Sequence, residues 1–183
     1  METYLNKIDT AKVNKLLEET GINVTYFNNA CADVVKKYSE ALDGLMKDLY
    51  IDCIKSNDAP MEKIESYYLE LSNMIYFMMD KVEELGVYAD MSSSASKEIY
   101  SKSYLANSVI KDEKGKSKST VSELTAQASL DSQYETVVAS IYDHAYKIVK
   151  NKVEAAKDMC SCLKRILVAR TNELQFSAFN KGQ

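Results

Sequence analysis

The chain has 183 residues, of which 46% are hydrophobic and 27% are charged, a composition typical of a folded protein rather than a disordered one. One proline and five glycines are too few for the many turns of an all-β or α/β protein, so the composition predicts long helices. The N-terminal residues lack the basic start and apolar run of a signal peptide, and no apolar stretch approaches the length of a membrane span. We therefore expect a cytoplasmic protein with no membrane contact.

Charge divides the chain into two halves. Residues 1–91 hold 9 Lys or Arg against 17 Asp or Glu, and residues 92–183 hold 14 against 10, so their net charges are −8 and +4. This segregation predicts an acidic helical hairpin domain at 1–91 and a basic helical domain at 92–183. It also predicts a polyanionic partner for the second domain.

Hydrophobic spacing predicts three helices in the first half. They cover about 2–19, 27–56 and 61–85, and each carries apolar residues every three or four positions. Proline ends one helix and begins the next well, so the turn at Pro60 predicts that the second and third helices form an antiparallel hairpin. Gly86 stands where a C-terminal cap belongs, and the third helix is therefore expected to end there.

The second half is expected to contain a helix at about 94–110, an exposed loop at 111–119 and a long C-terminal helix at about 132–179. The loop segment has no apolar residue, and Thr120 with Glu123 fits a capping box that opens a further helix. No segment shows the alternation of a β-strand. The predicted fold is all-α, with long antiparallel helical hairpins and an extended C-terminal helix.

A heptad-like apolar seam follows the C-terminal helix and is broken by Lys152 and Glu173. A seam over four heptads indicates coiled-coil packing, either within the chain or between copies in a homo-oligomer. The residues of this seam are Val138, Ile141, Ala145, Ile148, Ala155, Met159, Cys162, Ile166 and Ala169.

The sequence offers little for catalysis. His144 is the single histidine, and its neighbour Asp143 projects about 100° away from it on a helix, so the two do not face each other. There is no Gly-rich phosphate loop and no Glu-x-x-His motif. Cys160 and Cys162 diverge by about 200° and cannot share a metal ion, so the four cysteines are expected to be buried thiols. We expect no enzyme, no metal and no cofactor.

Basic residues with interleaved tyrosines mark the helix at 94–110. Tyr100 and Tyr104 are spaced by four and share a face with Lys97, and Lys102 lies between the two tyrosines. Aromatic rings stack on bases while lysines neutralise phosphates, as single-stranded nucleic acid binding requires. The alternative is that both tyrosines pack in the core with their hydroxyls at its rim.

Two further basic groups follow. The loop contributes Lys114, Lys116 and Lys118, which either clamp a phosphate backbone or are simply solvated. Five residues of the C-terminal helix fall within a sector of about 100° and form a stripe about 27 Å long, unless they are an ordinary solvent face. These five are Lys147, Lys150, Lys157, Lys164 and Arg165.

The second half resembles the phage recombination-mediator family of the UvsY type. The resemblance is carried by the Lys- and Tyr-containing segment 96–105, the polar loop 111–119, the segment 131–134 that opens a long helix, and the basic, apolar and acidic segment 159–173. Segment 69–88 is similar to uncharacterised proteins of phages that infect Firmicutes. The chain departs from the mediator family in the length of its acidic N-terminal hairpin.

The resemblance implies a non-enzymatic helical protein that assembles as an oligomeric ring and binds single-stranded DNA. Such a protein helps a RecA-like recombinase to displace single-strand-binding protein. The implied DNA contacts are Lys97, Lys102, Tyr104, Lys114, Lys116 and Lys118. The implied assembly seam is Ile141, Ile148, Met159 and Ile166.

Two other functions fit the sequence. In the first, the chain is a protein-binding helical adaptor, such as a phage accessory or anti-defence factor, that acts through its acidic hairpin. The basic face then serves solubility or pairs with that hairpin. In the second, the chain is a structural or virion component built from long helices.

Overall fold

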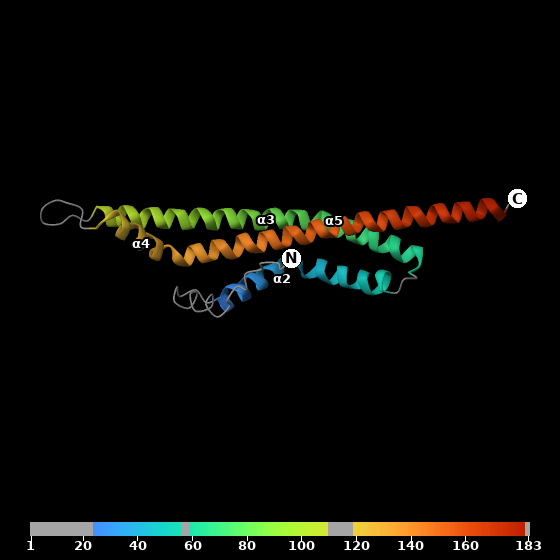
Figure 1. Cartoon of the computed structure of the whole chain (residues 1–183), viewed down its shortest axis with the longest axis horizontal. Helices are drawn as coiled ribbons and strands as arrows, with labels where there is room; N and C mark the ends of the chain where they lie inside the picture. Colours follow the sequence, from blue (N-terminus) through green and yellow to red (C-terminus); the bar gives the residue numbers. More distant parts are fainter. Residues whose placement is uncertain (1–23, 56–58, 110–118, 182–183) are drawn as a thin grey trace, which may run out of the picture.

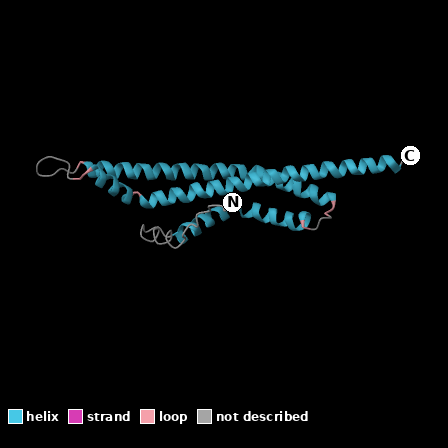
Figure 2. Ribbon diagram, viewed as in Figure 1, coloured by secondary structure: helices cyan, strands magenta, loops and turns pink. Residues whose placement is uncertain are grey.

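The computed structural model describes residues 24–55, 59–109 and 119–181, and this part of the chain is all-α, without a strand (Figure 2). The elements in chain order are α2 (Val24–Leu49), the short π-helix η1 (Tyr50–Ile54), α3 (Met61–Ser108), α4 (Val121–Asp131) and α5 (Gln133–Lys181). The helix expected at 2–19 lies outside the described residues. The all-α prediction is confirmed.

Two long helices form the central framework of the molecule. Helices α3 and α5 run side by side in opposite directions, α2 packs against both, and α4 covers the end of α3 (Figure 1). The antiparallel register is fixed by contacts along the pair, from Ser96 with Thr136 at one end to Ala59 with Arg170 at the other. Because α5 continues beyond Arg170 to Lys181, its last turns extend past the start of α3 (Figure 1).

The core lies where α2, α3 and α5 meet. Each helix contributes apolar residues at intervals of three or four, which is the spacing that keeps one face of a helix inward. Leu42, Leu49, Leu71, Met78 and Leu85 are at most 1% exposed, and burial of such side chains contributes about 1.5–3 kcal/mol each. This core holds α2 against the long antiparallel pair.

Helix α3 does not end at Gly86 and runs unbroken from Met61 to Ser108. The prediction of a C-terminal cap at Gly86 is therefore wrong. A Cβ atom at Gly86 would lie 3.3 Å from Cε2 of Tyr146, so the glycine serves the close approach of α3 to α5. The domain boundary expected at residue 91 falls inside this single helix, so the acidic and basic halves of the sequence share one element.

Two helices begin where the sequence predicts. Pro60 is the N-cap residue of α3, as the turn at this position predicted. The capping box before α4 is confirmed: the Thr120 hydroxyl accepts from the Glu123 backbone N–H at 3.3 Å, and the Glu123 carboxylate accepts from the Thr120 N–H at 2.7 Å. This second hydrogen bond lowers the pKa of Glu123. Among the described helices, none combines the length and apolar character needed to cross a bilayer.

Candidate nucleic-acid interface

The four residues singled out around 97–104 do not form one site. Lys97 and Tyr100 line a cavity where α3, α4 and α5 meet, which we call the junction pocket. Lys102 lies about 140° around α3 from Lys97 and so points to a different side of the helix. Its Nζ is 2.5 Å from Oε1 of Glu98, and this hydrogen bond lowers the pKa of Glu98. Tyr104 stacks on Tyr100 with ring centroids 6.5 Å apart, but it does not line the pocket. Only two of the four residues therefore belong together.

The basic residues of α5 face away from α2. Their common sector is centred about 170° from Lys152, whose side chain points to α2. Asp143 and Glu154 lie in the same sector and pair with Lys147 at 2.6 Å and with Lys157 at 2.9 Å. The continuous basic stripe expected from the sequence is thus interrupted by two carboxylates from the same helix.

Four of the predicted cations form no ion pair with any described residue. They are Lys97, Lys150, Lys164 and Arg165, and all four side chains are exposed. The Lys150 ammonium lies 5.6 Å from the ring centroid of Tyr146, close enough for a cation–π contact. Lys114, Lys116 and Lys118 lie outside the described residues, in the segment that joins the end of α3 to the start of α4.

A shallow groove follows the α3–α5 contact from the junction pocket toward the middle of the molecule. Asp90 and Asp143 line its next section, together with Lys97, and Glu83 follows. Further on, Lys150 and Lys157 line the groove together with Glu83 and Glu154. A phosphate backbone lying along the whole groove would therefore meet carboxylates in its middle.

The two charged halves of the sequence pack against each other. Residues 61–90 of α3 contain 2 Lys and 7 Asp or Glu, and residues 147–170 of α5 contain 7 Lys or Arg and 2 Asp or Glu, so the net charges are −5 and +5. These segments lie antiparallel, and Ser72 Oγ is 3.1 Å from Cys160 Sγ near their middle. Opposite net charges thus lie side by side, although none of the ion pairs among the described residues joins α3 to α5.

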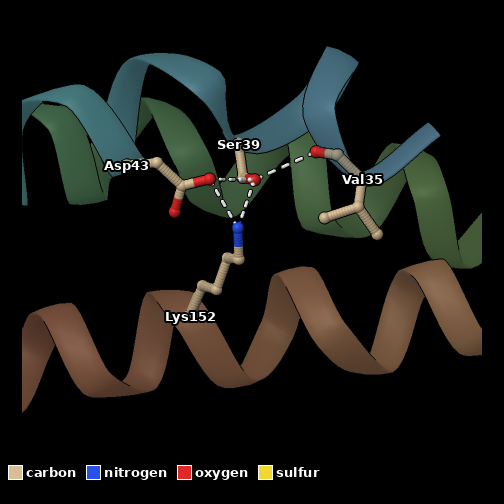
Figure 3. Close-up of polar contacts among 4 residues, drawn as sticks. All are labelled: Val35, Ser39, Asp43 and Lys152. Atoms are coloured by element: carbon tan, nitrogen blue, oxygen red, sulfur yellow. Dashed lines mark hydrogen bonds and ion pairs between the residues drawn. The ribbon is translucent and has the colours of Figure 1, made fainter. Parts of the chain in front are cut away.

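Lys152 anchors α2 to α5, a role that the sequence pattern did not suggest (Figure 3). Its ammonium donates to Ser39 Oγ at 3.0 Å and lies 2.5 Å from Oδ2 of Asp43. Ser39 is completely buried, and its hydroxyl is 3.0 Å from both the Val35 carbonyl oxygen and Asp43 Oδ2. The lysine that interrupts the predicted apolar seam thus satisfies a buried polar group between two helices.

The apolar seam of α5 is shifted from the predicted one. Ile141 is buried as expected and Met159 packs at the edge of the core, but Ile148 and Ile166 are each 41% exposed. Beyond Ala145 the buried positions are Val149, Val153, Ala156 and Leu163. A strict seven-residue repeat drifts by about 20° per heptad on a straight helix, so beyond Ala145 the buried positions lie one residue later than the predicted seam.

The groups considered for catalysis remain apart. His144 is exposed and forms a T-shaped contact with Phe27, with ring centroids 5.8 Å apart, while Asp143 pairs with Lys147. Within the described part of the chain, no three His, Cys, Asp or Glu residues gather as a metal site would require. Cys31 is buried, and burial raises its pKa, whereas Cys162 is exposed, contrary to the expectation that all four thiols are buried.

No protein-family model, curated protein or solved structure matches the chain. The resemblance to the recombination-mediator family accordingly stays a prediction from sequence.

Proposed function

We propose that the protein is a non-enzymatic single-stranded DNA-binding protein of the recombination-mediator type. The observation that carries this proposal is the set of exposed cations on α3 and α5 that form no ion pair within the described residues, Lys97, Lys150, Lys164 and Arg165. Cations on rigid helices neutralise phosphates and release condensed counterions, which supplies most of the affinity for a nucleic acid backbone.

The paired lysines add to this surface. Lys102, Lys147 and Lys157 each pair with a carboxylate three or four residues away on the same helix. Exposed pairs of this kind contribute only about 0.3–0.5 kcal/mol, so a phosphate can displace the carboxylate at little cost. These lysines are therefore available to a strand even though the helices carry balancing acidic residues.

The recombination role rests on the resemblance of segments 96–105 and 131–173 to the mediator family. It implies a RecA-like recombinase and single-strand-binding protein as partners, and a homo-oligomer as the active form. Ile148 and Ile166, each 41% exposed, are the large apolar side chains of the predicted seam that remain for contacts between copies. Sedimentation of the full chain tests the assembly: a monomer at micromolar concentration would contradict it.

The DNA proposal is tested by fluorescence anisotropy with labelled oligo-dT across a salt series. Three or four phosphate contacts predict a log–log salt slope of about −2 to −3 for the wild type, since each contact to a single strand contributes about 0.7. Lys164→Ala combined with Arg165→Ala should reduce the magnitude of the slope by about 1.4.

The matched control is Lys36→Ala combined with Lys37→Ala, another adjacent pair of cations, on α2 and outside the proposed DNA-binding surface. This control changes the net charge by the same amount and should leave the slope unchanged. Equal effects of the two double variants, or no binding by the wild type at low salt, would contradict the proposal.

A second candidate function, a protein-binding adaptor, is favoured by the exposed apolar residues on α3. Tyr76 and Phe77 are 70% and 63% exposed and contact each other edge to face at 5.4 Å. Aromatic side chains that are this exposed are enriched at protein interfaces. The adaptor function predicts no binding to oligo-dT at physiological salt. It also predicts that Tyr76→Ser combined with Phe77→Ser removes every co-purifying protein, while the Lys164 and Arg165 double variant retains them.

A further inference from the structure

The junction pocket is a cavity of about 630 Å³ at the meeting point of α3, α4 and α5. Cavities of about 300–1,000 Å³ are typical of sites for small molecules. The residues that line it are Ser96, Lys97, Tyr100, Ser101, Ser129, Ser132, Gln133, Thr136 and Val137. No carboxylate occurs among these lining residues, whereas the adjoining groove contains Asp90, Asp143 and Glu83. The pocket is therefore the section of the α3–α5 groove best suited to an anion.

Hydrogen bonds inside the pocket wall fix its shape. The Thr136 hydroxyl donates to the Ser132 carbonyl oxygen at 2.8 Å, and Thr136 has a single O–H, so it accepts the 2.8 Å hydrogen bond from Ser96. The Ser132 hydroxyl, which is buried, donates to the Ala128 carbonyl oxygen. These bonds tie α3 to the break between α4 and α5. The pocket is thus formed before any ligand arrives.

The groups left to meet a ligand are polar donors and one aromatic ring. The ammonium of Lys97 and the hydroxyls of Ser101 and Ser129 are exposed on the wall. Tyr100 lines the pocket, and its ring stacks on Tyr104 with an angle of 19° between the planes. A cation with neighbouring hydroxyls suits a phosphate group, and a supported aromatic ring suits a base.

We propose that the junction pocket holds one nucleotide, with its phosphate on Lys97, Ser101 and Ser129 and its base against Tyr100. This inference rests on the proposed binding of single-stranded DNA and names the place where the strand is held. The same chemistry could come from a free mononucleotide, so the experiment includes both ligands.

The test uses the full chain and labelled oligo-dT, with two matched pairs of single variants. Tyr100→Leu should weaken binding about 5- to 150-fold, the range expected from loss of one stacked base, whereas Tyr104→Leu should weaken it less. Lys97→Ala should reduce the magnitude of the salt slope by about 0.7, whereas Lys36→Ala, on α2 and outside the proposed DNA-binding surface, should leave the slope unchanged.

A third matched pair introduces a carboxylate, in one variant on the pocket wall and in the other outside the pocket. Ser101→Glu puts a carboxylate on the pocket wall and should repel the phosphate, while Ser94→Glu puts one on an exposed position of α3 that does not line the pocket. Helical content by circular dichroism should be the same for both variants. Displacement of oligo-dT by excess dTMP would show that the pocket accepts an isolated nucleotide, and failure of dTMP to compete would assign it to a nucleotide within a strand.

The outcomes separate this inference from the proposed function. If the wild type fails to bind oligo-dT even at low salt, the proposed function fails. If the wild type binds but each pocket variant behaves like its matched control, the strand lies elsewhere and the pocket assignment is overturned.

Discussion

The two ends of the helical assembly differ in how they are packed. Where α2 covers α3 and α5, large side chains such as Leu42, Leu71 and Leu85 are fully buried. At the α4 end, Leu124 is the large buried side chain of α4, beside the small residues Ala128 and Ser132. Small residues leave room between helices, and the junction pocket lies there. We infer that stability is concentrated at the first end, and that the pocket proposed for a nucleotide lies at the second.

The largest expected effect comes from truncating a leucine in the α2-covered core. Leu71→Ala should lower the free energy of unfolding by about 2–5 kcal/mol because it leaves a cavity among fully buried side chains. Leu124→Ala should cost less, about 2 kcal/mol, because the buried residues beside it, Ala128 and Ser132, are small and it leaves a smaller set of contacts. Urea denaturation of both variants measures the difference, and equal costs would show that the two ends do not differ.

Glycine substitutions make a second test of packing. Gly86→Leu should destabilise the fold by about 1–3 kcal/mol, because the ring of Tyr146 occupies the space that the new side chain needs. A Cβ atom added at Gly44 on α2 would meet no neighbour within 4 Å, so Gly44→Ala should stabilise the fold by up to about 1 kcal/mol through helix propensity. Thermal unfolding measures both, and stabilisation by Gly86→Leu would contradict the close approach of α3 and α5.

The polar anchor between α2 and α5 gives a smaller effect. Lys152→Ala leaves buried Ser39 and half-exposed Asp43 without their cation and should cost about 1–2 kcal/mol. Lys147→Ala removes an exposed pair within one helix and should change stability by no more than about 0.5 kcal/mol. Chemical denaturation distinguishes the two, and hydrogen exchange should show the loss in α2. Equal losses of unfolding free energy in the two variants would mean that the contact of Lys152 with α2 does not stabilise the fold.

The smallest effect is expected at the start of α4. Thr120→Ala removes the cap and should cost about 1 kcal/mol, felt locally in α4 by hydrogen exchange. The pKa of Glu123 is lowered in the folded state, so its contribution is present above its ordinary pKa of 4.5 and is lost as the pH falls through the folded value. Protection of α4 should therefore decline in acid for the wild type more than for Glu123→Gln, and identical pH profiles would exclude this role.

The sequence predicted the helices better than it predicted their contacts. The start of α3 after Pro60 and the capping box at Thr120 follow from local chemistry, and both are present. Gly86 was misread because a glycine that ends a helix and one that admits a neighbouring ring look alike in one sequence. The difference lies in Tyr146, sixty residues away, and no local pattern reveals it.

The candidate site was predictable only in part. Lys97 and Tyr100 were identified because they share a helix face, but Ser129 and Thr136 come from other elements and have no distinctive pattern. The alternation of basic residues with Asp143 and Glu154 within one sector could have been read from their spacing. The pairing of acidic α3 with basic α5 depends on the antiparallel register and so required the fold.

The most direct test of the central claim compares the affinity of the full chain for single-stranded and duplex DNA of equal length across a salt series. If a strand reaches the exposed cations and the pocket lined by Tyr100, the protein should bind single-stranded DNA more tightly than duplex DNA, because only unpaired bases can stack in the pocket. The affinity should fall as salt rises. No binding at low salt, or equal affinity for both DNAs, would contradict the account.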